Sequence, residues 1–330
     1  LKKGEKYLMW GISPQFFNPM KVIIPIAGKG TRARPHTYSK PKPFLPLAGK
    51  TAIDFLIEPI LKLHTEEIII VHDKYTEDFV KDFFIKKYPH INIIYVLQKD
   101  PKGTADAIYQ AKPYINEEED ILIAYCDTIF KNGLSEIIKK PCDGVIFAVK
   151  VKDPENYGVL EHNEGVITSL VEKPKEPKSN LANIGLYYFK DGYTFINKYV
   201  KKVIDSGLNE KGEYYLTDAF LYMIEDGKKL LAEPIDYIDT GTVEKIIQAN
   251  ICLLDGKTIQ GHNVQIENSE IGENVSIGNN TIIRNSKIKN SIIGSNSTID
   301  DMEIEDSLIG DNVKLKKGKT FNIGDSCCIS

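Results

Sequence analysis

Residues 21–35 read KVIIPIAGKGTRARP, and this stretch decides the fold of the chain. Its opening residues, 21–27, form an apolar and β-branched run that predicts a buried strand. Gly28 and Gly30 follow directly, and glycine lets a backbone loop come close to a phosphate and offer its N–H groups. Because α/β sheets bind ligands where their strands end, the stretch predicts a phosphate site at the carboxyl end of the first strand.

The glycines open a loop that is rich in cations and prolines. Its cations are Lys29, Arg32, Arg34, Lys40 and Lys42. The spacing of Gly28, Gly30 and Ala33 also fits a dinucleotide-binding fingerprint, but that motif requires an α-helix to begin here. Prolines at positions 35, 41, 43 and 46 disfavour a helix, so we expect a long phosphate-binding loop.

Strand-like and helix-like stretches alternate from residue 20 to about residue 255. Strands are expected near 21–27, 67–72, 91–97, 121–126, 145–152, 158–161, 165–172, 183–189 and 230–238. Helices are expected near 53–63, 75–87, 104–114, 193–205, 214–226 and 243–254. This order predicts the α/β class, with a Rossmann-like mixed, mostly parallel sheet flanked by helices.

The spacing of apolar residues along the sequence changes at Asp255-Gly256-Lys257. Beyond it, aliphatic residues recur every five or six positions, at 266, 271, 277, 283, 288, 293, 299, 304, 309 and 315. Glycines and asparagines fill the positions between them, where tight corners are needed. Such a hexapeptide-like repeat predicts a short parallel β-helix of about three 18-residue coils. We therefore expect a leader outside the core at 1–19, an α/β domain at 20–255 and a β-helix domain at 256–330.

Bulk properties narrow the functional classes. The net charge of −4 provides no global basic field, so we expect no nucleic-acid partner. No apolar run reaches the length of a membrane helix, and we expect no membrane partner. Five scattered cysteines fit neither a disulfide framework nor a zinc site, and Cys327 and Cys328 have no assigned role. These features together are typical of a protein of the reducing cytoplasm.

A set of motifs in fixed order resembles the sugar-1-phosphate nucleotidyltransferases, in particular the glucose-1-phosphate thymidylyl- and uridylyltransferases. The motifs run from the glycine loop through residues 41–46 (PKPFLP), 98–105 (QKDPKGTA), Asp127, 157–159 (YGV), 171–174 (VEKP), 182–185 (ANIG), 215–218 (YLTD) and 238–242 (IDTGT). The resemblance covers about residues 20–255, and a left-handed β-helix tail is common in the family. It implies a catalytic domain that joins a nucleoside triphosphate to a sugar 1-phosphate and releases pyrophosphate.

The resemblance also implies roles for individual residues. Arg32 and Lys42 are expected to contact phosphates, and Lys173 to hold the sugar phosphate; Arg suits bidentate phosphate contacts and Lys suits a point charge. The expected nucleotide-binding residues are Ala27, Gly28, Gly30, Thr31, Gln98, Gly103 and Thr104. The expected sugar-phosphate-binding residues are Gly158, Glu172, Lys173 and Asn183.

Asp127 and Asp239 are the candidate ligands of a Mg²⁺ cofactor. Each aspartate closes a predicted strand, and Mg²⁺ is commonly bound by one or two carboxylates together with substrate phosphates. The nucleophile is the substrate's own phosphate, so the reaction requires no catalytic Ser, Cys or general base. The catalytic interpretation depends on the two carboxylates converging on one ion.

The substrates are only partly specified. The amide of Gln98 can donate and accept, which matches the edge of uracil or thymine and favours dTTP or UTP without separating them. Gly103 is expected to leave space for the base. A carboxylate and an amide at Glu172 and Asn183 suit the hydroxyls of a hexose; we expect glucose 1-phosphate, with N-acetylglucosamine 1-phosphate left open.

Three functional readings remain. The leading one is a Mg²⁺-dependent glucose-1-phosphate thymidylyl- or uridylyltransferase that forms homo-oligomers, with the β-helix as a candidate interface. The second is a non-catalytic regulatory subunit, a class that usually loses the metal aspartates or the glycine loop, both of which this chain retains. The third is a bifunctional enzyme whose tail transfers acetyl groups, although the tail is short and its single histidine, His262, precedes the main repeats.

Overall fold

The computed structural model describes residues 18–28, 30–63, 65–130, 134–137 and 140–317. The chain divides into two compact units. The first consists of the described residues within Leu1–Gly30, Ser39–Pro43 and Ile53–Ile238, and the second of those within Thr31–Tyr38, Phe44–Ala52 and Asp239–Ser330. Cys327, Cys328 and most of the predicted leader lie outside the described residues.

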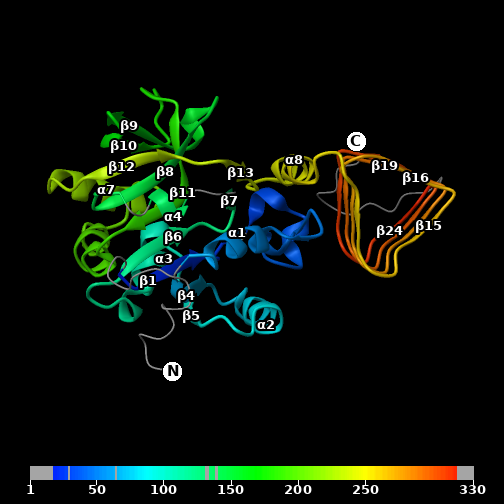
Figure 1. Ribbon diagram of the computed structural model, residues 1–330, viewed down its shortest axis with the longest axis horizontal. Helices are drawn as coiled ribbons and strands as arrows, with labels where there is room; N and C mark the ends of the chain where they lie inside the picture. The colour runs from blue at the N-terminus through cyan, green and yellow to red at the C-terminus, as the bar shows by residue number, and fades with distance from the viewer. Residues whose placement is uncertain (1–17, 29, 64, 131–133, 138–139, 318–330) are drawn as a thin grey trace. The chain divides into compact units, whose positions relative to one another are not determined.

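The first unit is built on a nine-stranded sheet in the order β5-β4-β1-β6-β11-β8-β12-β10-β9. In sheet order the strands are Ile93–Leu97, Thr65–His72, Met20–Pro25, Asp120–Ala124, Leu181–Phe189, Gly144–Lys150, Leu230–Pro234, Val166–Glu172 and Gly158–Asn163. Strands β5, β4, β1 and β6 pair in parallel, whereas β11 and β10 run against their neighbours. The sheet is therefore mixed and mostly parallel, as predicted (Figure 1).

Helices follow the strands as the alternation predicted. They are α1 (Ala52–Ile60), α2 (Glu77–Lys87), α3 (Thr104–Gln110), α4 (Leu134–Ile137), α5 (Gly192–Thr194), α6 (Lys201–Asp205), α7 (Leu216–Glu225) and α8 (Val243–Leu254), with a π-helical segment Phe195–Val200 between α5 and α6. Helix α3 ends earlier than expected because Pro113 has no N–H to continue it, and a 3₁₀ turn follows. Pro234 likewise ends β12, and the expected strand resumes as β13 (Tyr237–Asp239).

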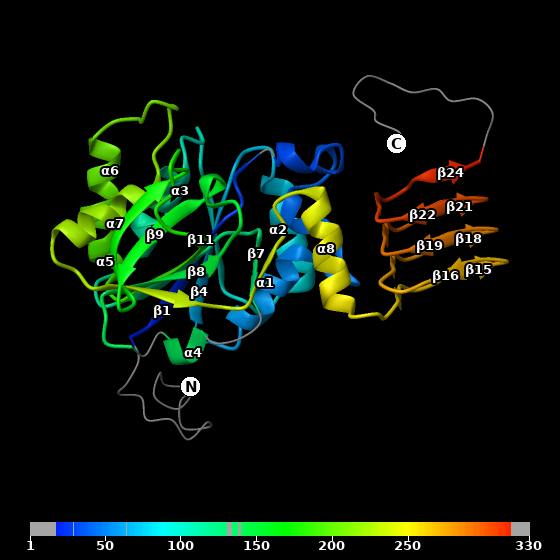
Figure 2. The same ribbon diagram turned by 90° about the horizontal axis from the view of Figure 1, so that it is seen from above.

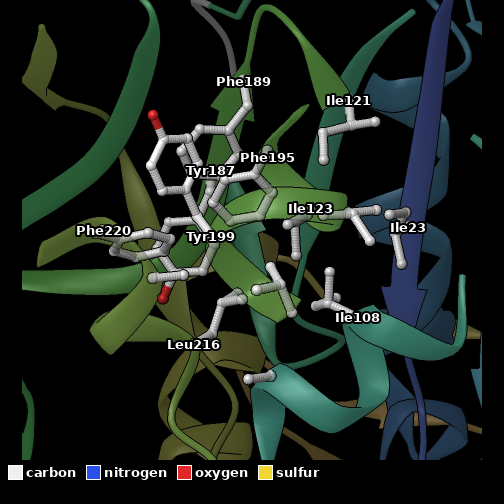
Figure 3. Close-up of a cluster of buried hydrophobic side chains, with 14 of the residues drawn as sticks. Ile23, Ile108, Ile121, Ile123, Tyr187, Phe189, Phe195, Tyr199, Leu216 and Phe220 are labelled. Carbon is white, nitrogen blue, oxygen red and sulfur yellow. The ribbon is translucent and has the colours of Figure 1, made fainter. Parts of the chain in front are cut away.

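The core of the first unit packs helices α3 and α7 and the π-helical segment against one face of the sheet. Ile121 and Ile123 point to this face from β6, because alternate residues of a strand share a side. Phe189 and Phe195 stack with ring centroids 3.8 Å apart, and Phe220 packs beside them (Figure 3). The residues between the inward ones are also buried, as expected of parallel strands covered on both faces.

The chain from Ile259 to Lys316 in the second unit folds as a parallel β-helix, and its rungs stack in register (Figure 2). The strands are β14 (Ile259–Gln260), β15 (Gln265–Glu267), β16 (Glu270–Ile271), β17 (Ser276–Ile277), β18 (Ile282–Arg284), β19 (Lys287–Lys289), β20 (Ile292–Ile293), β21 (Thr298–Asp300), β22 (Glu303–Glu305), β23 (Leu308–Ile309) and β24 (Lys314–Lys316). Every pairing between these strands is parallel.

The coil length differs from the expected value. Ile266 pairs with Ile283 and Ile283 with Ile299, which gives coils of 17 and 16 residues instead of 18. The sides of the coil have five or six residues, and asparagine or aspartate in the left-handed conformation lies at the corners between them. Side chains of corner asparagines stack into a ladder, with Asn263 donating to Asn280 and Asn280 to Asn296.

Strands β2 (Pro46–Leu47) and β3 (Lys50–Thr51) form a two-stranded antiparallel hairpin. Asn18 Nδ2 donates to Asp120 Oδ1 at 3.0 Å, so the predicted leader is tied to β6 from this residue on. Among the described residues, none of the helices has the length and apolar character needed to cross a membrane.

Candidate active site

Four candidate site residues lie at one edge of the first unit's sheet. Gly28 follows β1, Asp73 follows β4, Gln98 follows β5 and Asp127 follows β6. These four strands are parallel neighbours, so their carboxyl ends meet at the same edge. The structure therefore brings together three positions that the sequence predicted and one, Asp73, that it did not.

Asp73 organises the glycine loop. Its Oδ2 accepts a hydrogen bond from the backbone N of Gly28 at 3.2 Å. Its Oδ1 accepts two more, from the backbone N of Tyr75 and of Thr76, at 2.8 and 2.9 Å. A buried carboxylate thus joins the loop after β1 to the turn after β4. The position of Asp73 at a strand end was the only sequence signal for this role.

The loop that follows contains no α-helix. Between Thr31 and Phe44 it forms three 3₁₀ turns, Thr31–Ala33, His36–Tyr38 and Lys42–Phe44. The exclusion of a dinucleotide-binding helix on the basis of the prolines is confirmed. Lys29 lies outside the described residues, and Ala27, Gly30 and Thr31 are placed on the loop as expected.

Lys42 and Asp127 form a close ion pair. The distance from Lys42 Nζ to Asp127 Oδ2 is 2.7 Å, and the two side chains are 13% and 30% exposed. The loop cation and the carboxylate at the end of β6 therefore meet although 85 residues separate them in the chain. The carboxylate oxygens of Asp127 are hard donors of the kind that Mg²⁺ prefers, and they lie where they already attract a positive charge.

Cys126 precedes Asp127 and is not a nucleophile. Burial, together with the neighbouring charge of Asp127, raises the pKa of the Cys126 thiol to about 12. The thiol therefore stays protonated and unreactive near neutral pH. This agrees with a reaction in which the substrate supplies the nucleophile.

The amide of Gln98 is held in one orientation. Gln98 is 2% exposed, and its Nε2 donates to Asp106 Oδ2 at 2.5 Å and more weakly to the carbonyl oxygen of Gly103 at 3.4 Å. Because a carboxylate only accepts hydrogen bonds, it fixes the NH₂ group on its own side and leaves the Gln98 carbonyl oxygen to face elsewhere. Asp106, at the start of α3, is a second site residue that was not predicted from the sequence.

Gly103 makes room for a neighbouring part of the backbone, and its expected role in leaving space for the base stays a prediction. Its φ is 111°, and a Cβ built on it would lie 2.5 Å from the carbonyl oxygen of Tyr214. The missing side chain therefore makes room for the backbone of Tyr214. The neighbouring Thr104 Oγ1 accepts a hydrogen bond from the backbone N of Leu216, so both residues anchor the start of α7.

The predicted sugar site is assembled by strand pairing. Gly158 of β9 is the register partner of Glu172 of β10, and Asn183 of β11 donates from its Nδ2 to the carbonyl oxygen of Gly158 at 3.0 Å. A Cβ on Gly158 would lie 2.0 Å from Asn183 Nδ2 and 2.8 Å from Glu172 Oε2, so a larger residue would displace these side chains. Tyr187 fixes the amide by donating to Asn183 Oδ1 at 2.6 Å.

Glu172 and Lys173 differ in environment. Burial raises the pKa of Glu172, and the charge of Lys173 opposes this effect. Lys173 is exposed and has a φ of 48°, in the left-handed region that side chains rarely adopt. Its backbone N donates to the carbonyl oxygen of Tyr157 at 2.9 Å, which holds the turn after β10.

Asp239 and Arg32 belong to the second unit. Asp239 Oδ1 accepts from the backbone N of Gly241 at 2.7 Å, and Oδ2 pairs with Lys245 Nζ at 2.6 Å. A Cβ on Gly241 would lie 4.0 Å from Arg32 Nη1. The structure therefore gathers Arg32, Asp239 and Lys245 near the start of α8; the convergence of Asp239 with Asp127 stays a prediction.

The donor set is compatible with a divalent ion. Within the described ranges, His, Cys, Asp and Glu side chains do not gather in groups of three or more. A metal bound to Asp127 or Asp239 would therefore use few carboxylates and take its remaining ligands from phosphates and water, the usual arrangement for Mg²⁺.

Comparison with known proteins identifies the family to which the chain belongs. The family model described as "Nucleotidyl transferase" matches residues 21–256. The chain is 35% identical to the bifunctional protein GlmU of Methanocaldococcus jannaschii over 273 residues, which are 82% of this chain and 61% of that protein. It is 34% identical to a bifunctional sugar-1-phosphate nucleotidylyltransferase/acetyltransferase of Sulfurisphaera tokodaii over 270 residues, covering 80% and 62%. The chain thus spans about three fifths of the length of these relatives.

Solved structures show the same fold. A UDP-glucose pyrophosphorylase complexed with UDP-glucose matches with a TM-score of 0.62 and 25% identity, covering 72% of this chain and 99% of that one. A Bacillus anthracis protein described as a glucose-1-phosphate thymidylyltransferase matches with a TM-score of 0.62 and 24% identity, covering 71% and 94%. The strand-end residues, the family model and the curated relatives agree: the chain belongs to the nucleotidyl transferase family.

Proposed function

We propose that this protein is a sugar-1-phosphate nucleotidyltransferase. The observation that carries the proposal is the arrangement of Gly28, Gln98, Asp127 and Lys42 at one edge of the sheet. In the same sheet, Gly158, Glu172 and Asn183 are brought together by the pairing of β9 with β10 and β11. The relative from Sulfurisphaera tokodaii, whose name includes this activity, supports it.

Different residues of the candidate site would position the two anionic substrates. The glycine loop and Arg32 would hold the triphosphate, and Lys42 would stabilise the charge that develops on the reacting phosphate. Lys173 would hold the sugar phosphate, while Glu172 and Asn183 orient the sugar hydroxyls. When bound to Asp127 and Asp239, Mg²⁺ would neutralise phosphate charge during transfer.

We propose a pyrimidine nucleotide, dTTP or UTP, as the first substrate. The orientation of the Gln98 amide supports this choice, since its carbonyl oxygen is the atom directed away from Asp106. A carbonyl oxygen accepts the N3–H that both uracil and thymine present. Glucose 1-phosphate is the proposed second substrate, because the carboxylate of Glu172 and the amide of Asn183 suit vicinal hydroxyls.

The test is release of pyrophosphate by the purified chain with Mg²⁺, assayed with five sugar 1-phosphates against all common nucleoside triphosphates. We expect release with a pyrimidine nucleotide and a hexose 1-phosphate. The Asp127→Asn variant, which retains the shape of the side chain but loses its charge, is expected to keep its circular dichroism spectrum and to lose turnover. Absence of release with every combination would reject the proposal.

A bifunctional enzyme is the second candidate, favoured by the names of the relatives and by the β-helix that follows α8. Such an enzyme would bind acetyl-CoA on its β-helix. Calorimetric titration of acetyl-CoA into the protein separates the two candidates: saturable heat supports the second activity, and no heat removes it.

We further propose that the chain assembles into homo-oligomers through the β-helix.

A further inference from the structure

A single buried amide joins three parts of the second unit. Asn250 of α8 is 0% exposed. Its Oδ1 accepts hydrogen bonds from the backbone N of Ala48 at 2.9 Å and from Ser276 Oγ at 2.7 Å. Its Nδ2 donates to the carbonyl oxygen of Asn274 at 2.9 Å. The side chain therefore connects α8, the β2–β3 turn and the part of the β-helix where the first coil passes into the second.

The turn that Asn250 holds has an unfavourable backbone. Ala48 has a φ of 43° and Gly49 a φ of 78°, and the left-handed region is disfavoured for alanine. The Cα of Gly49 faces the β-helix, because a Cβ built there would lie 3.0 Å from Ile259 Cδ1. A residue kept in such a conformation needs surrounding contacts that determine it. Asn250 and the first strand of the β-helix supply these contacts.

This turn ends the loop that carries the cations. The loop segment Phe44–Ala52 belongs to the same unit as the β-helix, and Leu45 and Leu47 are buried in it. Helix α8 begins at Val243, two residues after Gly241, beside which the Arg32 guanidinium lies. With a rise of about 1.5 Å per residue, Asn250 lies roughly 10 Å along the helix from that end. Within the second unit, the segment from Gly241 to Asn250 thus lies beside Arg32 at its start and holds the Ala48 turn at its end.

We propose that Asn250 is a positioning residue for the triphosphate and that the β-helix serves as a brace for the phosphate-binding loop. The inference rests on the proposed function. Without the amide, the N–H of Ala48 and the carbonyl oxygen of Asn274 lose their partner in a buried place, and the turn shifts to recover one. Arg32, which lies in the same unit as the turn, then binds phosphate in a less ordered arrangement. Glu172 and Asn183 belong to the first unit, so the affinity for the sugar phosphate is unaffected.

The experiment compares Asn250→Ala with Ser276→Ala, which removes only one of the three bonds, and with a control, Asn296→Ala. Asn296 is a corner asparagine of the same β-helix that receives a hydrogen bond from Asn280. Dissociation constants for Mg²⁺-dTTP and Mg²⁺-UTP are measured by calorimetry. We expect Asn250→Ala to weaken binding about tenfold and Ser276→Ala about threefold, with KM for glucose 1-phosphate unchanged within about twofold for both.

Hydrogen exchange supplies a readout that does not depend on nucleotide. Asn250→Ala is expected to speed exchange in peptides from 30–52 while peptides from 158–189 stay as in the wild type, and Asn296→Ala is expected to leave both unchanged. Wild-type protein that binds no nucleotide rejects the proposed function, and the exchange data then judge the brace alone. Unchanged exchange in 30–52, or an equal rise of both substrates' KM, overturns the inference.

Discussion

At the scale of single residues, the site depends on side chains that orient other side chains. Asp73 orients the glycine loop, Asp106 orients Gln98, and Tyr187 orients Asn183. The carboxylates of Asp73 and Asp106 only accept hydrogen bonds, and the Asn183 amide is fixed because it donates to the carbonyl oxygen of Gly158 while it accepts from Tyr187. These supporting residues decide how well the substrate-facing groups are placed before substrate arrives.

Asp106 provides the first prediction. Replacing it by asparagine leaves a side chain that both donates and accepts, so the Gln98 amide is no longer fixed in one orientation. We expect KM for the nucleotide to rise by roughly tenfold, the size of one lost charge-assisted hydrogen bond, with KM for the sugar phosphate unchanged. Steady-state kinetics with each substrate varied in turn measure this. Asp82→Asn, on the exposed face of α2, is the matched control; equal effects of the two changes would refute the assignment.

Glu172 provides a pH prediction. Burial raises the pKa of this carboxyl above its ordinary value, so the carboxylate is protonated at a higher pH than an exposed glutamate would be. As the pH falls through that raised value, the carboxylate that accepts sugar hydroxyls is lost, and KM for the sugar phosphate should rise. The substrate phosphate also titrates near pH ~6. Glu172→Gln controls for this, since its profile should retain only the substrate's titration; identical profiles would exclude Glu172 as the cause.

At the scale of elements, the β-helix has its own core, which a stability measurement can isolate. Ile299 is 0% exposed and stacks between Ile283 and Leu315 on neighbouring coils. Ile299→Ala is expected to destabilise the fold by about 2–5 kcal/mol, as for other buried isoleucines truncated to alanine. Urea unfolding followed by circular dichroism measures this. Ile282→Ala, on the half-exposed outward side of the same sheet, should have a much smaller effect.

Sequence reasoning located most elements because their signals are local. The aliphatic run of β1, the prolines of the loop and the repeat of the β-helix each report on the chain around them. Coil length was mispredicted because three steps of six residues were assumed for each coil, whereas the mixed steps of five and six sum to 16 or 17. Asp73 and Asp106 were missed because their partners, Gly28 and Gln98, are brought to them only by strand order and by the entry of α3. Motif resemblance found Gln98 and Asn183, but the reason for Gly103 required Tyr214, which is distant in sequence.

At the scale of the whole molecule, two sides of the β-helix carry ladders of alternating charge. On one side Glu267 pairs with Arg284 and Asp300 with Lys316, at 2.9 and 3.3 Å. On another, Lys289 pairs with Glu273 at 3.3 Å. Contacts between copies of the chain through these sides would be ionic in character, because the outward groups are charged.

The proposed homo-oligomer is therefore expected to weaken with salt. Raising the ionic strength from about 0.05 M to about 0.5 M shortens the range of electrostatic attraction severalfold and should lower the association constant. Sedimentation velocity at the two salt concentrations measures the mass of the assembly. The Glu267→Lys variant reverses one rung of the ladder and should shift the same equilibrium. An assembly whose mass is indifferent to both changes does not use these sides.

The corners of the β-helix also constrain how its length can vary. Each coil closes on left-handed asparagine or aspartate residues and repeats after 16 or 17 positions, so one coil presents nearly the same upper and lower surface as the next. Inserting or deleting one entire coil would keep every inward aliphatic pointing inward and would leave Asn250 and its partners untouched. Inserting a single residue within a rung would instead turn that rung's side chains inside out. The β-helix can thus gain or lose whole coils, and its length can change without any change in the contacts around Asn250.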